Sequence, residues 1–316
     1  MLDGKYKIFI VFICILLPVF AKAEVLQLDD ALRATYTACI GIDDELSDLK
    51  KMAGINTAVT AVGTAAGAGA TVVGLVKENK DTKAEELEKL IKELHELEDG
   101  QNEPTEEELE AFLNEFEISY EDAIENLATN EDKLKTLNKQ SKNLGKWRTG
   151  LMIGNTATNV AGAIIAKNNN VDDDLQIQID NCKKAVDELQ KSIMQARIDG
   201  EDVTEAQEIA NACKEYNYVD ISPINKRGKG TMISSVIGAT TGLAGSVTSA
   251  MANTDKTRND NTDAGAQKEK NLNTASNVLA GTSTVASATA TVFNATQISA
   301  IKKVAAVAEK CTEVLK

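Results

Sequence analysis

The stretch Asn155-Thr156-Ala157-Thr158-Asn159-Val160-Ala161-Gly162 decides how this chain folds, because it is uncharged and built from small side chains. Similar stretches occur elsewhere, and the triplet Asn-Thr-Ala recurs at Asn56 and at Asn273. Four segments of this kind consist largely of Ala, Gly, Thr, Ser and Val: 55–76, 149–166, 230–254 and 271–301. Helices of small residues can approach one another closely, either in a membrane or in a tight bundle.

Small residues recur at every fourth position in these segments, for example at Gly238 and Gly242. Positions four apart share nearly the same helix face, so the pattern predicts flat grooves in which two backbones meet. The residues predicted to pack against a neighbouring helix are Gly63, Gly67, Gly150, Gly154, Gly162, Gly238 and Gly242.

The rest of the chain also predicts helices. Leucines and other apolar residues follow alternating spacings of four and three, typical of a coiled-coil seam, and no alternating strand pattern occurs. We therefore expect an all-α protein, an elongated helical bundle with coiled-coil-like hairpins and four small-residue helices. A faint internal duplication suggests two helical halves, 24–168 and 169–316, with an acidic coiled-coil insert at 81–145.

The N-terminal residues 1–23 have the pattern of a secretory signal peptide. Lys5 and Lys7 precede an apolar run, and Ala21-Lys22-Ala23 is typical of a cleavage site. The apolar run is short for a membrane span, so cleavage is preferred over anchoring. We expect export to a periplasm or to the exterior, with membrane association of the exported chain left open.

An even number of cysteines follows the predicted signal peptide, which in an exported chain favours two disulfides. Three connectivities are possible. Cys182 and Cys213 lie on helices joined by a short turn, so they are the preferred pair, which leaves Cys39 and Cys311 to join the first helix to the last.

The sequence offers no constellation for catalysis, so we expect no enzyme, no cofactor and no metal site. His95 lies between Glu93 and Glu96 on an acidic helix, where a solvated side chain is the simpler interpretation. The segment 199–202 is acidic but lacks the full calcium-loop pattern. A net charge of −14 disfavours binding to nucleic acid.

Two functions remain open. The first is an exported scaffold or envelope interaction protein that assembles through its small-residue helices, by self-association or with another envelope protein. The alternative is a membrane-inserting or pore-forming helical protein. Trp147, between Lys146 and Arg148, resembles an interfacial anchor and favours the alternative. The asparagines of the small-residue segments oppose it, because an amide is costly in lipid.

Overall fold

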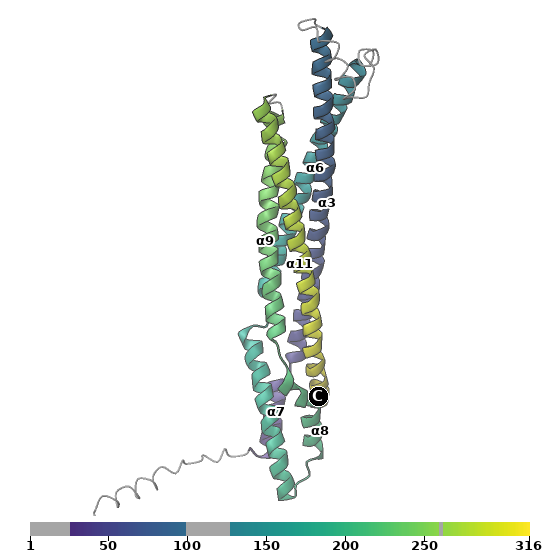
Figure 1. The fold of residues 1–316 in the computed structure, drawn as a ribbon. Helices are drawn as coiled ribbons and strands as arrows, with labels where there is room; N and C mark the ends of the chain where they lie inside the picture. The colour runs from purple at the N-terminus through teal and green to yellow at the C-terminus, as the bar shows by residue number, and fades with distance from the viewer. Residues whose placement is uncertain (1–25, 99–126, 259–261) are drawn as a thin grey trace, which may run out of the picture. The chain divides into compact units, whose positions relative to one another are not determined.

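The computed structural model describes residues 26–98, 127–258 and 262–316 and is all-α, as the sequence predicts (Figure 1). No strand occurs in these ranges. The predicted signal peptide and the middle of the predicted acidic insert lie outside them. The elements are α2 (Leu28–Cys39), α3 (Ile42–Glu98), α6 (Leu127–Asn168), α7 (Asp173–Asp199), α8 (Thr204–Cys213), the 3-10 helix η1 (Lys214–Tyr218), α9 (Ser222–Ala252), α10 (Asp255–Arg258) and α11 (Asp263–Leu315).

The chain divides into two compact units. The first, here called the disulfide unit, comprises residues up to Leu46, Asp172–Asp220 and Val304–Lys316. The second, the bundle unit, comprises Ser47–Val171 and Ile221–Lys303. Each unit draws residues from both predicted halves, and the internal duplication stays a prediction.

In the disulfide unit, α2 packs along α7 and the two helices are joined by a Cys39–Cys182 disulfide, with 4.8 Å between the Cα atoms. A second disulfide joins Cys213 of α8 to Cys311 of α11, with 4.5 Å between the Cα atoms. The four cysteines that follow the predicted signal peptide are therefore paired, but the preferred pairing of Cys182 with Cys213 is wrong. The reason is that Cys182 faces α2, so its partner comes from a helix distant in sequence.

The ends of α7 are fixed by local sequence. The Asp172 side chain caps the N-terminus by accepting a hydrogen bond from the Leu175 amide at 2.8 Å. At the other end Gly200 has φ of +82°, a left-handed conformation that glycine adopts without strain. The helix therefore begins and ends at residues suited to those positions.

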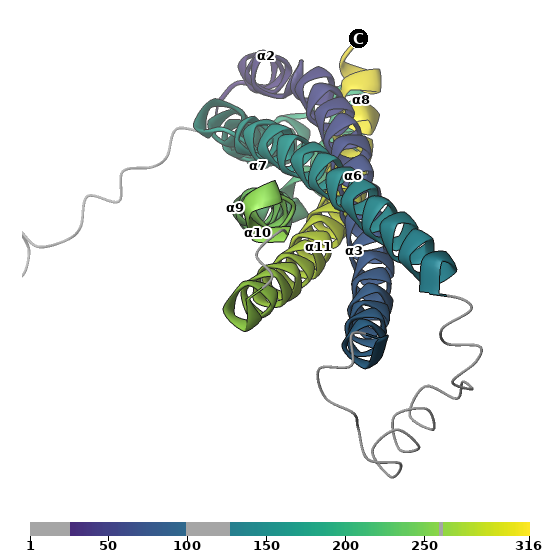
Figure 2. The same ribbon diagram turned by 90° about the horizontal axis from the view of Figure 1, so that it is seen from above.

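The bundle unit is built from α3, α6, α9 and α11, which run alongside one another in alternating directions (Figures 1 and 2). Hydrogen bonds define its two ends. At one end, called the basic end, Gln297 Nε2 donates to Asn169 O at 2.8 Å and lies 3.3 Å from Ile224 O. At the other end, called the network end, Arg148 bonds to Ser249 of α9 and to α11.

Candidate functional site

The interior of the bundle unit combines polar side chains with small apolar ones, including a hydrophobic cluster of Ala70, Met152 and Ala280. The buried face of α3 presents small or polar residues, among them Asn56, Thr60, Gly63 and Gly67. Similar faces on the other helices meet it. Eight of these buried polar residues, each at most 1 % exposed, form what we call the polar ladder: Asn56, Thr60, Asn155, Asn159, Thr231, Ser283, Ser287 and Asn294.

The asparagines of the polar ladder bond across helices. Asn155 Nδ2 donates to Ser283 Oγ at 2.7 Å, and Asn159 Nδ2 donates to Ser287 Oγ at 2.8 Å. Asn56 Nδ2 donates to Asn294 Oδ1 at 3.2 Å. An amide is costly in lipid when it lacks a partner, whereas these amides face inward and bond to neighbouring helices.

Glycines on the inner faces allow the bundle helices to approach one another closely. An added Cβ at Gly238 would lie 2.7 Å from Asn159 Oδ1, and one at Gly242 would lie 2.6 Å from Thr156 Oγ1. Gly63, Gly67 and Gly162 also lie against side chains of neighbouring helices. The small-residue faces are therefore occupied within a single chain.

Two of the glycines predicted to pack against a neighbouring helix do not do so. At Gly150 and Gly154 an added Cβ would meet no heavy atom of the described chain within 4 Å, and both residues are exposed. The fourfold spacing places them near the others in sequence, but they lie on the outer face of α6. The structure adds close-packed glycines that the pattern missed: Gly74, Gly145, Gly228 and Gly245.

A partly buried group of charged and polar residues lies at the network end. Arg148 donates from Nε to Ser249 Oγ, from Nη1 to Asn277 Oδ1 and from Nη2 to Asn273 Oδ1, each at 2.9 Å. Arg148 and Lys77 are both 0 % exposed. We call the following set the charge network: Lys77, Asp81, Ser141, Arg148, Arg258 and Glu269.

Opposite charges compensate much of this burial. Lys77 Nζ forms an ion pair with the Asp81 carboxylate and lies 3.5 Å from Glu269 Oε1. The same Glu269 oxygen lies 3.5 Å from Arg258 Nη1. Burial lowers the pKa of Lys77, and attraction to Asp81 opposes the change. Burial lowers the pKa of Arg148 to about 10, against attraction from Asp81, so the guanidinium keeps its charge near neutral pH. Asp81 and Ser141 lie within the predicted insert 81–145, so the two ends of that segment contribute to the buried part of the bundle.

The outer face of the bundle unit is apolar. Between residues 52 and 76 of α3, every exposed residue is Met, Ile, Ala, Val or Leu. Large aliphatic side chains are similarly exposed on α6, α9 and α11, with Ile164 at 59 %, Leu243 at 57 % and Val285 at 66 %. We call this surface the apolar band; it comprises the exposed residues of 52–76, 149–166, 230–252 and 278–296, segments that carry no charged residue.

The hydroxyl groups in the apolar band are turned back onto the helix backbone. On α11, Thr282, Thr289 and Thr296 each donate to the carbonyl oxygen four residues earlier, at 2.8 to 2.9 Å. Thr240 of α9 does the same at 3.0 Å. This bond satisfies the hydroxyl without water or a partner molecule.

The length of the apolar band is close to that of a bilayer core. At 1.5 Å per residue, 149–166 rises about 27 Å and 52–76 about 37 Å, on either side of the ~30 Å hydrocarbon thickness. By length and composition, one stretch of the described chain, Leu28–Lys92, passes the test for a membrane span, with 28 % of its apolar window buried, and α6, α9 and α11 do not pass it. Trp147 is 69 % exposed and lies beside Arg148, at the edge of the band.

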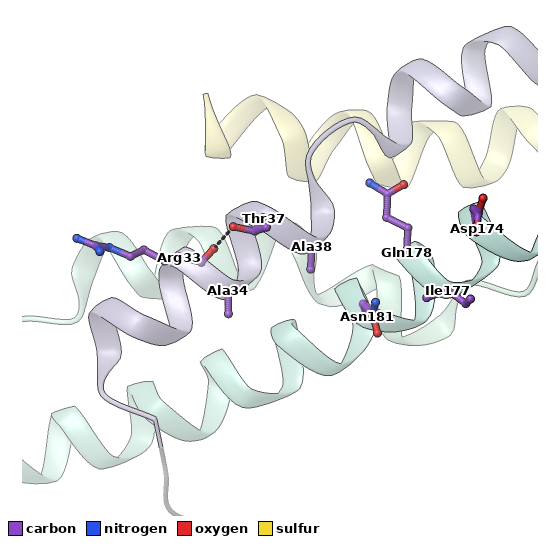
Figure 3. Close-up of a pocket in the computed structure, with 8 residues that line it drawn as sticks. All are labelled: Arg33, Ala34, Thr37, Ala38, Asp174, Ile177, Gln178 and Asn181. Atoms are coloured by element: carbon purple, nitrogen blue, oxygen red, sulfur yellow. Dashed lines mark hydrogen bonds between the residues drawn. The ribbon is translucent and has the colours of Figure 1, made fainter.

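The disulfide unit also carries a surface groove. It lies between α2 and α7, is wide open, and is lined by Arg33, Ala34, Thr37, Ala38, Asp174, Ile177, Gln178 and Asn181 (Figure 3). Thr37 Oγ1 donates to Arg33 O at 2.9 Å, and Gln178 Nε2 donates to Ile40 O at 3.0 Å. These polar groups serve the helices themselves, so the groove presents few that converge on a ligand.

His95 lies on α3 with Nε2 3.4 Å from Glu131 Oε1 and is exposed, as expected of a solvated helix face. Within 26–98, 127–258 and 262–316, no group of three or more His, Cys, Asp or Glu is placed to hold a metal ion. The absence of catalysis stays a prediction. Comparison of the chain with protein-family models, curated proteins and solved structures gives no match.

Proposed function

We propose that the bundle unit is a membrane-inserting helical protein, with the apolar band against lipid acyl chains and the polar ladder inside. The observation that carries this proposal is the distribution of polarity: buried positions hold Asn, Ser and Thr beside small apolar residues, while the large exposed side chains of the apolar band are Val, Ile, Leu and Met. Soluble monomers rarely expose contiguous apolar surface larger than a few hundred Å². In lipid the same arrangement is favourable, because only the inward-facing polar groups need partners.

The distribution of the apolar band favours lipid over one protein partner. Each of α3, α6, α9 and α11 contributes exposed aliphatic residues, so the band lies on several sides of the bundle. A protein partner would cover one side. The alternative of a scaffold assembling through small-residue grooves loses support, because glycines such as Gly63 and Gly238 already contact helices of the same chain.

The polar ladder also suggests what an inserted bundle would do. Its asparagines and serines are mutually hydrogen-bonded and at most 1 % exposed, so they are shielded from solvent in this conformation. Separation of the helices would expose a lining of amides and hydroxyls, which suits a path for water or small ions. We therefore interpret this conformation as the closed form of a membrane-inserted, non-enzymatic protein.

The compartment is part of the proposal. Two disulfides are typical of an oxidising environment, which agrees with export directed by residues 1–23. Self-association and contact with another envelope protein are compatible with insertion, whereas the overall negative charge disfavours nucleic acid as a partner.

Extraction of the expressed full chain from membranes tests the proposal. We expect the protein to resist alkaline carbonate washing and to enter the detergent-rich phase on phase separation. A protein that is released by carbonate and runs as a discrete oligomer in buffer without detergent would contradict insertion. That result would support the scaffold function, with copies of the chain covering one another's apolar band.

A further inference from the structure

The basic end of the bundle unit carries a concentrated positive charge. Eight basic residues lie on the four bundle helices within a few residues of the apolar band, and we call them the basic belt: Lys50, Lys51, Lys167, Lys226, Arg227, Lys229, Lys302 and Lys303. All are exposed except Arg227, which is half-buried. This concentration is notable in a chain with a net charge of −14.

Cross-helix contacts bring these residues to one level. Asn294 of α11 accepts from Asn56 of α3 and from Thr231 of α9, at 3.2 and 3.1 Å. One turn further along α11, Gln297 Nε2 donates to the carbonyl oxygen of Asn169, the residue that follows α6. The basic residues of α3, α9 and α11 lie beyond these contacts, and Lys167 of α6 lies two residues before Asn169, so the basic residues form a group around one end of the bundle.

Few carboxylates of the bundle unit oppose this charge. In the segments 47–56, 162–171, 221–231 and 294–303 the single acidic residue is Asp48, whose Oδ1 lies 2.8 Å from Lys51 Nζ. Asp172, Asp173, Asp174 and Asp220 adjoin these segments in sequence and belong to the disulfide unit. The network end differs, because its basic residues have acidic neighbours, as in the pair of Lys142 with Asp255 at 2.6 Å. Arg227 Nη1 donates to Thr296 O at 2.8 Å, but no acidic residue of the four segments lies beside it in sequence.

We propose that the basic belt binds the phosphate groups of anionic lipids in the leaflet at this end of the bundle. This inference rests on the proposed membrane insertion and adds the class of lipid. Lysine side chains just outside an apolar band extend along it and place their ammonium groups at headgroup level. Anionic lipid attracts such residues, and each contributes substantially to affinity close to the surface.

The experiment compares lipids by their effect on melting. The full chain in a neutral detergent is titrated with short-chain phosphatidylglycerol or short-chain phosphatidylcholine, and the midpoint of thermal unfolding is recorded. A lipid that binds the folded state raises the midpoint. We expect phosphatidylglycerol to act at lower concentration than phosphatidylcholine, and the difference to shrink in high salt because exposed charges are screened.

Two matched variants test whether the lipid acts at the basic belt. The variant K226Q/K229Q/K302Q removes three exposed lysines of the basic belt, and K256Q/K268Q/K270Q removes three exposed lysines near the network end. We expect the first to need on the order of a hundredfold more phosphatidylglycerol for the same stabilisation, and the second to behave as the unaltered chain.

Equal responses to the two lipids, or equal losses in the two variants, would overturn the lipid assignment while membrane insertion stands. Inorganic phosphate is tested in parallel. If it stabilises as well as phosphatidylglycerol does, the belt is a site for free phosphate, and the lipid assignment is wrong. Failure of membrane insertion itself is detected separately, by release of the protein in the carbonate wash.

Discussion

At the scale of single residues, Arg148 combines full burial with three side-chain hydrogen bonds. Its guanidinium is fully buried and bonds to one serine and two asparagines from two other helices. An arginine fork satisfies such a set of acceptors because its donors lie in one fixed plane. Removal of the guanidinium would take this donor from the Asn273 and Asn277 amide oxygens, while Ser249 Oγ would keep its bond to Thr149 Oγ1.

Replacing this side chain tests the charge network. We expect Arg148→Met to lower the free energy of unfolding by about 3–5 kcal/mol, because Asp81 and the amides lose their buried partner. Lys146→Met is the control, since Lys146 is exposed and its loss should change stability by less than about 0.5 kcal/mol. Denaturant unfolding in mild detergent, followed by circular dichroism, measures both. Similar stabilities for the two variants would show that the network contributes little.

The glycines provide a second residue-scale prediction. Gly242→Leu should destabilise the bundle by about 1–3 kcal/mol, because the new side chain enters space held by Thr156 and Ser283. Gly154→Leu is the matched control on an open helix face. Thermal melts of the two variants decide the point: if the control is as unstable as Gly242→Leu, helix packing at Gly242 is not the cause.

At the scale of elements, each bundle helix separates a small, polar inner face from an aliphatic outer face. In water a charge added to the outer face would be nearly neutral for stability. In a bilayer a charged residue at the centre of a span costs about 2.5–3.5 kcal/mol on insertion scales. The two environments therefore give different outcomes for the same substitution.

Val285→Lys, at the middle of the apolar band on α11, makes that comparison. We expect it to reduce the fraction of protein retained in membranes after carbonate washing. The control is Ile198→Lys on α7 of the disulfide unit, where the isoleucine is 79 % exposed and lies outside the band. Unchanged retention of Val285→Lys would argue that its outer face meets water or a polar partner.

The sequence predicted the helices and much of their packing, because small residues at fourfold spacing leave few other folds. It also contained the inward position of the asparagines. Asn155 and Asn159 share a face with Met152 and Gly162, away from Ile153 and Ile164, and this separation of faces was a usable signal. Gly150 and Gly154 were assigned to the inner face because spacing alone does not say which side of a helix meets a neighbour.

At the scale of the whole molecule, the disulfides join segments far apart in sequence. They span separations of 143 and 98 residues, and both lie within the disulfide unit. Their pairing was not predictable from the sequence, since it depends on which helices become neighbours. Proximity along the chain favoured Cys182 with Cys213, whereas packing of α2 along α7 selected Cys39 for Cys182.

Peptide mapping without reduction should therefore recover Cys39 linked to Cys182 and Cys213 linked to Cys311. The double variant Cys213→Ser/Cys311→Ser should lose about 2–5 kcal/mol of stability, the usual cost of removing a native disulfide. Recovery of a Cys182–Cys213 peptide would contradict the fold of the disulfide unit.

In the proposed function, the apolar band of the bundle unit contacts lipid. The chain has a single tryptophan, so Trp147→Phe combined with Val285→Trp moves the only indole to the middle of the band. The most direct measurement is quenching of its fluorescence in vesicles by lipids brominated at different depths. We predict strongest quenching by bromines near the acyl chain ends for the Val285→Trp variant, and by shallow bromines for Trp147 in the unaltered chain. Quenching by aqueous acrylamide, with no effect of brominated lipid at any depth, would contradict the account.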